Sequence, residues 1–391
     1  MKITPTNGSS AVGPTPVQRL KIDLMTQGMS VSPAARDALM GRDGLRPLTL
    51  AEYASTSGIV LELDEDIWVN VPIADYNANF VTEPAFTLDY EGGFLLRGKD
   101  VVVPAKPAPV PSYHNERLPS GRLITDYAIT HTDRVRISPI QGCSYVCTFC
   151  DLPYDKRYEK MPVEGLVQSI RRALEDPVLP AHHVLISGGV PRDEDWPWLN
   201  QVYAEVATAF PALDIDIMMV PVPGHFNVTW LHEIGIHALF LNLELYSEET
   251  ARKIMPRKVR IGRDTFLDVI EEAVSLFGPG RVYSLLLAGL ESMEGTLSGV
   301  KALAERGCFP ILSPFRPDPG TPLRNHVPQN AEFLEEVYLR SLEIAVKEDV
   351  KLGPCCIPCT HNTLTLPDGS QPYYRSGDPK HCSQAARNAD V

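Results

Sequence analysis

The feature that most limits how this chain can fold is a regular alternation of strand and helix patterns from about Asp133 onward. Short apolar runs alternate with longer amphipathic stretches, and this order is typical of a parallel sheet covered by helices. The expected strands are Val135–Ile140, His183–Ser187, Asp214–Val220, Ala238–Glu244, Val282–Ala288 and Pro310–Pro314. The expected helices are Glu164–Glu175, Pro197–Phe210, Val228–Ile234, Arg263–Phe277, Met293–Arg306 and Ala331–Glu348. The sequence therefore predicts an α/β fold.

Upstream of this region the patterns change, and they divide the chain into four parts. Short runs of β-branched and aromatic residues between Gly58 and Val103 predict a β-rich N-terminal domain over residues 1–104. The proline-rich stretch that begins at Ala105 predicts an extended linker over residues 105–132. The alternating region, 133–330, is the predicted core, and residues 331–391 form a helix and a cysteine-bearing extension.

Three cysteines stand close together just after the first core strand. Cys143, Cys147 and Cys150 are separated by four and three positions, so they form a plausible set of metal ligands. An iron-sulfur cluster bound by four cysteines has every iron coordinated by protein, whereas three cysteines leave one iron open. Two other interpretations are a zinc site, which here lacks a fourth ligand in the usual paired arrangement, and cysteines with no ligand role.

The Cys-x3-Cys-x2-Cys pattern, with the aromatic Phe149 before its last cysteine, resembles the signature of the radical S-adenosylmethionine (SAM) superfamily. This resemblance implies a partial, six-stranded (β/α)6 barrel and a 4Fe-4S cluster on the three cysteines. It also implies that SAM binds the fourth iron and is split reductively into methionine and a 5′-deoxyadenosyl radical. The motif follows a strand, and barrel active sites lie at the carboxyl ends of the strands.

The resemblance also implies which residues contact SAM near the second strand and near the sixth. Gly188 and Gly189 occupy the place of the family's Gly-Gly-Glu-like turn, which offers backbone to the SAM amino group, although Val190 replaces the acidic residue. The stretch 313–323 resembles the sixth-strand exit of the biotin synthase-like branch, and Arg316 in it is a candidate for a substrate or SAM carboxylate. A loop arginine without such a role is the alternative.

Alternation along the fourth strand places Asn242 and Glu244 on one face. If that face points into the barrel, the two side chains are candidates for the SAM amino group or ribose hydroxyls. An ordinary polar strand end is the alternative. One of Arg257, Lys258 and Arg260, in the basic run that follows, is a candidate partner for the SAM carboxylate.

A second group of cysteines, Cys355, Cys356 and Cys359, follows the last core helix. One interpretation is an auxiliary iron-sulfur cluster, with Cys382 or His361 as a fourth ligand, that inserts sulfur or anchors substrate. The other is a trithiolate site for a thiophilic ion such as arsenic(III). The element resembles one in the arsinothricin-pathway enzyme, which transfers the 3-amino-3-carboxypropyl group of SAM to arsenic. Thiols that only fill space are the structural alternative.

Composition excludes some partners and compartments. The formal net charge of −13 provides no basic surface for nucleic acid. No apolar run approaches the roughly 18 residues of a membrane span, and the N-terminus has no apolar signal core. The cysteines cluster as ligands do rather than scatter as disulfides do. We therefore expect a cytoplasmic protein without membrane or nucleic-acid partners.

Together these features predict a radical SAM enzyme that acts on a small-molecule substrate in a biosynthetic reaction. Its expected cofactors are a 4Fe-4S cluster and SAM, with a second iron-sulfur cluster at the C-terminal cysteines. The expected electron donor is a flavodoxin or ferredoxin, because the cluster must lie at the low end of the iron-sulfur range of reduction potentials. A non-catalytic iron-sulfur sensor is the alternative from another functional class.

Overall fold

The computed structural model describes residues 14–43, 58–64, 67–354 and 356–366. Its largest element is a seven-stranded sheet in the order β16-β15-β14-β13-β12-β9-β8. The six strands from β9 to β16 are parallel neighbours in sequence order, and β8 pairs with β9 in antiparallel fashion. The strands are β8 (Ala128–His131), β9 (Arg134–Ile137), β12 (His183–Ser187), β13 (Ile215–Met218), β14 (Ala238–Phe240), β15 (Val282–Ala288) and β16 (Phe309–Pro314). The predicted α/β class and its parallel sheet are confirmed.

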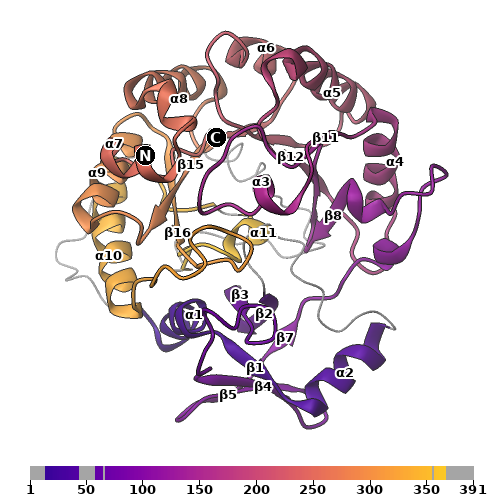
Figure 1. Cartoon of the computed structure of the whole chain (residues 1–391), viewed down its shortest axis with the longest axis vertical. Coiled ribbons are helices and arrows are strands. Elements are labelled where there is room, and N and C mark those ends of the chain that lie inside the picture. The colour runs from indigo at the N-terminus through magenta and orange to yellow at the C-terminus, as the bar shows by residue number, and fades with distance from the viewer. Residues whose placement is uncertain (1–13, 44–57, 65–66, 355, 367–391) are drawn as a thin grey trace, which may run out of the picture.

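Helices lie in an arc outside these strands (Figure 1). They are α4 (Val163–Leu174), α5 (Trp196–Ala209), α6 (Val228–Glu233), α7 (Glu248–Ile254), α8 (Arg263–Phe277), α9 (Met293–Ala304) and α10 (Ala331–Lys347). In α4, Leu166, Ile170 and Ala173 are buried at helical spacing, so one stripe of the helix packs into the core. The sequence patterns predicted all of these helices except α7, in which only Ala251 is buried.

The two faces of the sheet have different surroundings. Val184 and Ile186 of β12 belong to the large core that the helices cover, whereas Leu185 belongs to a separate apolar cluster on the opposite face. That second cluster also contains Phe240 and Tyr283. Successive side chains of a strand point to opposite faces, so His183 lies on the same face as Leu185.

The fourth core strand is shorter than predicted. β14 ends at Phe240, because polar side chains then take the place of ladder partners. The Leu243 backbone N–H donates to Ser284 Oγ at 3.0 Å, and the Leu285 N–H donates to Asn242 Oδ1 at 3.2 Å. Glu244 has a φ of +70°. The prediction that Asn242 and Glu244 share one face of a regular strand is therefore wrong, because the chain bulges between them.

The N-terminal part forms two small sheets. One contains β1 (Met29–Val31), β4 (Phe86–Tyr90), β5 (Phe94–Arg97) and β6 (Val102–Pro104), and the other contains β2 (Gly58–Asp64), β3 (Ile67–Pro72) and β7 (Lys106–Pro107). Two helices accompany them, α1 (Pro16–Gln27) and α2 (Pro33–Asp43). Thr15 and Gln18 form a capping box at the start of α1. Because α1 contacts β3 and α10, these sheets share one core with the parallel sheet.

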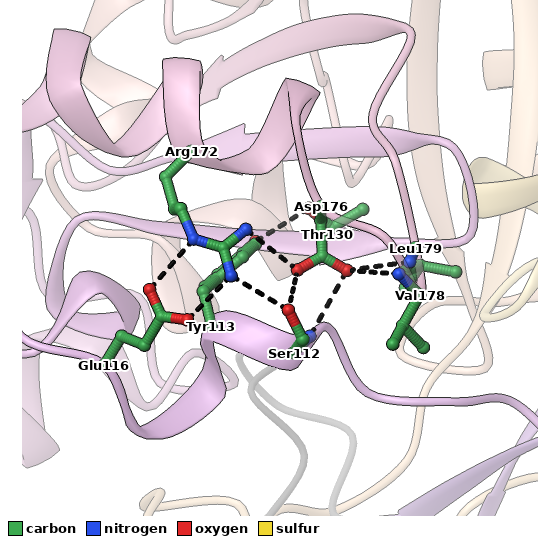
Figure 2. A network of polar contacts seen from close by, with 8 residues as sticks. All are labelled: Ser112, Tyr113, Glu116, Thr130, Arg172, Asp176, Val178 and Leu179. Atoms are coloured by element: carbon green, nitrogen blue, oxygen red, sulfur yellow. Dashed lines mark hydrogen bonds and ion pairs between the residues drawn. The ribbon is translucent and has the colours of Figure 1, made fainter.

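The stretch expected to be a linker, 105–132, contains β7, β8 and two 3₁₀ helices, η1 (Ser112–Asn115) and η2 (Ile124–Asp126). Figure 2 shows how η1 is fixed to the end of α4. The Asp176 carboxylate accepts hydrogen bonds from the Ser112 hydroxyl and backbone N–H, and from the Leu179 N–H at 2.7 Å. Arg172 forms ion pairs with both Asp176 and Glu116. This part of the stretch is therefore packed structure.

Short elements complete the described chain. They are β10 (Ile140–Gln141), β11 (Glu159–Lys160), α3 (Leu152–Asp155), η3 (Asp193–Asp195), η4 (Lys258–Ile261) and α11 (Ile357–Thr360). The segment around α11 runs beside β16, since the Gly353 N–H donates to the Pro310 carbonyl at 2.7 Å and the Leu364 N–H to the Leu312 carbonyl at 2.8 Å. No helix within the described ranges is long and apolar enough to cross a bilayer.

Candidate functional site

The loop that carries Cys143, Cys147 and Cys150 joins β10 to α3, at the carboxyl end of β9. Cys143 Sγ accepts hydrogen bonds from the backbone N–H groups of Tyr145 at 3.3 Å and Val190 at 3.2 Å. The Thr148 N–H donates to the Ile254 carbonyl at 2.9 Å. The loop is thus fixed on one side to the exit of β12 and on the other to the end of α7. N–H groups aimed at a sulfur stabilise a thiolate and tune a bound cluster.

The three cysteines are half-buried, and desolvation of their sulfur atoms decides their protonation. Burial raises the pKa of the Cys143 thiol, raises that of Cys147 to about 12, and raises that of Cys150 well above its ordinary value. Without a cation the thiols are therefore neutral near pH 7. A bound metal deprotonates a coordinating thiol outright, so the donor set fits a group that brings positive charge.

Within the described part of the chain, no three His, Cys, Asp or Glu side chains gather around the position of a single metal ion. A 4Fe-4S cluster makes a different demand, because each thiolate binds its own iron and the ligands stand around the cluster. Phe149 and Cys147 pack on an apolar cluster that includes Leu245, Met255 and Leu287. Apolar side chains therefore surround one side of the cysteine loop.

Gly189 lies where the turn after β12 meets the cysteine loop. A Cβ on Gly189 would stand 1.8 Å from the Gly142 carbonyl oxygen and 2.7 Å from Cys143 Cα, and one on Gly188 would stand 3.0 Å from the Ile140 oxygen. The cysteine loop therefore requires the small residue at Gly189. The contact of Gly188 and Gly189 with SAM stays a prediction.

A cavity of about 460 Å³ opens beside the cysteine loop and is lined by Tyr145, Arg192, Arg257 and Arg260 among others. These residues follow β9, β12 and β14, so the cavity lies at the carboxyl ends of the parallel strands. Its volume falls within the range of about 300–1,000 Å³ typical of small-molecule sites. Arg257 donates to the Ser144 carbonyl, and no ion pair involving Arg260 occurs among the residues that the structure describes.

Glu244 and Lys258 form a buried pair next to this loop. Lys258 Nζ donates to Glu244 Oε2 at 2.8 Å and also to the Asn242 carbonyl. The Asn242 side chain is bound to the Leu285 N–H, as described above. Of the two residues predicted to contact SAM from this strand, Glu244 thus has an ion-pair partner and Asn242 a backbone partner.

Arg316 lies at the end of β16 and is buried. Its Nη1 donates to the Asn70 carbonyl and its Nη2 to Asn362 Oδ1, both at 2.8 Å. Burial lowers the pKa of the guanidinium to about 10. These contacts connect β16 with an N-terminal strand and with the C-terminal segment, and they favour a structural role for Arg316.

The second thiol group lies at the opposite end of the strands. Cys356 Sγ is 3.5 Å from His183 Nε2, and Arg134 Nη1 donates to Cys359 Sγ at 2.6 Å. His183 and Arg134 are paired first residues of β12 and β9. The carboxyl ends of these same two strands lead to the Cys143 loop, about 10 Å further along at 3.3 Å per residue. The two thiol sites therefore lie at opposite ends of β9 and β12, separated by the length of these strands.

Of the other predicted members of the second thiol site, the structure describes His361. Cys355 and Cys382 lie outside the described residues. The His361 ring stacks on Trp68 with centroids 5.6 Å apart, and burial lowers its pKa to about 3. Sequence reasoning missed His183 and Arg134. His183 begins a predicted strand, whereas Arg134 precedes the predicted strand by one residue, and in the structure both lie on the strand face that is turned away from the helices.

No family model matches the sequence. The chain is 30% identical over 115 residues to the bacteriochlorophyllide c C-7(1)-hydroxylase of Chlorobaculum limnaeum, a match that covers 29% of each chain. The chain thus spans less than a third of the length of this curated relative.

The chain also has a distant similarity to solved structures. A radical SAM methyltransferase from Sphaerobacter thermophilus is 14% identical with a TM-score of 0.43, covering 70% of this chain and 78% of that one. Streptococcus suis SuiB, bound to precursor peptide SuiA, is 13% identical with a TM-score of 0.45, covering 57% and 48%. In its three-cysteine motif, and in the place of that motif after the first parallel strand, the chain resembles the radical SAM superfamily.

Proposed function

We propose that this protein is a radical SAM enzyme that cleaves SAM reductively at a 4Fe-4S cluster and acts on a small molecule. One observation carries the proposal: three half-buried cysteines lie on one loop at the carboxyl ends of parallel strands, beside a cavity of about 460 Å³. We also propose that the sheet is a partial barrel of the (β/α)6 type. Its parallel strands follow sequence order, with β16 and β8 at the two edges.

The residues around the cysteine loop have separate proposed roles. The Tyr145 and Val190 N–H groups donate to Cys143 and hold its sulfur in place. Arg257 and Arg260 face the cavity, where a guanidinium pairs well with the carboxylate of SAM. When bound, the cluster supplies the electron that cleaves SAM. Gly188, Gly189, Asn242 and Glu244 remain the proposed contacts of SAM, and a flavodoxin or ferredoxin the proposed electron donor.

The test is reductive cleavage of SAM under anaerobic conditions. We expect the reconstituted protein to release 5′-deoxyadenosine or another SAM fragment after reduction, and the Cys147→Ser variant to release none. Cys308→Ala is the matched control, because Cys308 is a buried core cysteine outside both thiol sites. A loaded cluster that never yields a SAM fragment favours the sensor alternative, and zinc in place of iron contradicts the proposal.

We propose in addition that the C-terminal cysteines bind an auxiliary iron-sulfur cluster. Cys356 and Cys359 are held against His183 and Arg134 at the amino ends of the strands. Imidazole and thiolate both suit iron, so His183 joins His361 and Cys382 as a candidate fourth ligand.

The alternative, in which arsenic(III) on these thiolates accepts the 3-amino-3-carboxypropyl group, requires contact with SAM. The cavity at the Cys143 loop lies at the other end of the strands. Leu185, Phe240 and Tyr283 fill the face between the two ends. The separation supports the auxiliary cluster over direct transfer from SAM to a thiolate-bound substrate.

Iron content decides between these interpretations. We expect the Cys356→Ala/Cys359→Ala variant to lose about four irons per chain after reconstitution, the content of one 4Fe-4S cluster. Cys308→Ala again serves as the control and should keep them. Unchanged iron contradicts the auxiliary cluster, and binding of arsenite to the wild type but not to the variant would then support the thiophile site.

A further inference from the structure

The chain leaves β14 through an irregular stretch that places one carboxylate in an unusual backbone conformation. The Leu241 N–H still donates to the Tyr283 carbonyl, but the bulge at Asn242 and Leu243 interrupts the ladder. Glu244 rejoins β15 through two backbone bonds of 2.8 Å, to Leu285 and from Leu287. At its φ of +70°, a non-glycine residue has a strained backbone. The backbone hydrogen bonds to β15 therefore stabilise this conformation of Glu244.

Lys258 is the charged partner of that carboxylate. Its side chain is 4% exposed and that of Glu244 is 17% exposed, and the two atoms Nζ and Oε2 are 2.8 Å apart. The ammonium group also lies 5.4 Å from the centre of the Phe266 ring. Water screens such a pair poorly, so each charge acts strongly on its neighbours.

The cysteine loop is one of those neighbours. Cys147 packs on the apolar cluster that contains Leu245, the residue after Glu244, and Met255, one turn before Lys258. The Ile254 carbonyl accepts the Thr148 N–H. Glu244 and Lys258 both interact electrostatically with the sulfurs of Cys143 and Cys147. The two charges thus reach the same sulfurs with opposite effects.

We propose that Lys258 and Glu244 are a positioning pair that sets the reduction potential of the cluster on Cys143, Cys147 and Cys150. This inference rests on the proposed function. Reduction adds one negative charge to the cluster, so the Lys258 ammonium stabilises the reduced form and the Glu244 carboxylate stabilises the oxidised form. Nearby charge and solvent exposure are established determinants of cluster potential. With both charges present, their opposite effects on the reduction potential offset each other.

The experiment is a redox titration of the reconstituted protein, monitored by electron paramagnetic resonance without SAM. We expect Lys258→Met to lower the potential and Glu244→Gln to raise it. Each shift should reach at least tenfold in the reduction equilibrium, which is 59 mV for a one-electron couple. The double variant should return toward the wild type. Lys253→Met is the control, since Lys253 pairs with Glu249 on the exposed side of α7.

The outcomes separate this inference from the proposed function. If the wild type binds no cluster at these cysteines, the proposed function itself is wrong. If it binds one but the two single variants shift the potential in the same direction, or not at all, the pair is only structural. Lys258→Arg keeps the charge and should keep the wild-type potential. If Lys258→Met does not fold, Lys258→Arg and Glu244→Gln still test the proposal.

Discussion

Of the glycines around the cysteine loop, Gly189 would bring a Cβ closest to the backbone of its neighbours, so a substitution there tests how tightly the loop is held. A methyl group would overlap the Gly142 oxygen and Cys143 Cα, which are backbone atoms that cannot rotate away. We expect Gly189→Ala to destabilise the protein by about 1–3 kcal/mol, as overpacking does. It should also lower the iron bound after reconstitution, measured by iron analysis.

Gly93→Ala is the matched control, because a Cβ on Gly93 meets nothing within 4 Å. It should keep the iron content and the stability of the wild type. Full iron loading in Gly189→Ala would mean that the loop can move away from β12 without losing its geometry.

The cysteines were accessible to sequence reasoning because ligand spacing is local, whereas the polar residues around them were not. The side chain of Asn242 was expected beside that of Glu244, but it replaces a ladder acceptor for Leu285. A bulge depends on the neighbouring strand, which the sequence of one strand does not reveal. The same limit hid the approach of Arg134 to Cys359, since the two residues are 225 positions apart.

The junction between η1 and α4 depends on Asp176, which belongs to neither element. Its carboxylate accepts hydrogen bonds from Ser112, Val178 and Leu179 and pairs with Arg172. Burial opposes the charge, but these hydrogen bonds leave the pKa of Asp176 below its ordinary value of 3.8. We expect Asp176→Asn to cost about 1–3 kcal/mol of unfolding free energy at pH 7, measured by urea denaturation.

The pH dependence of that cost follows from the direction of the pKa shift. A carboxyl with a lowered pKa in the folded state contributes stability above its unfolded pKa, and loses it as the pH falls through the folded value. The difference between the wild type and Asp176→Asn should therefore shrink below about pH 4. Glu175→Gln, one residue earlier and exposed, should show no such change. A constant difference down to pH 2 would contradict this account.

Elements with strong periodicity were predicted with their bounds. β12, β15 and α8 begin and end where the patterns of apolar residues do. β14 and the stretch 105–132 differ from expectation for opposite reasons. In β14, side chains replace ladder partners early, whereas in 105–132 tertiary contacts such as those of Asp176 fix a proline-rich segment that local composition predicts to be extended.

The arrangement of the molecule places one thiol group at each end of the same two strands, and the N-terminal helix supports the second group. Lys21 of α1 is fully buried, and its Nζ donates to the carbonyls of Thr360 and Thr365, both at 2.9 Å. Thr360 ends α11 and Thr365 lies beyond it, so both follow Cys359 in the chain. One side chain near the start of the chain thus holds the segment that carries the second thiol group.

Replacing Lys21 with methionine keeps its volume but leaves two buried carbonyls without their donor. Each lost hydrogen bond to a charged group costs about 1.5–3 kcal/mol, and local opening is set by the same free energy. In Lys21→Met we therefore expect amide hydrogen exchange over residues 356–366 to rise at least roughly tenfold, read by mass spectrometry. Lys106→Met, which removes an exposed lysine paired with Glu62, should leave that exchange unchanged. Equal protection in both variants would mean that the contacts beside β16 hold the segment alone, and that α1 covers the second thiol group without anchoring it.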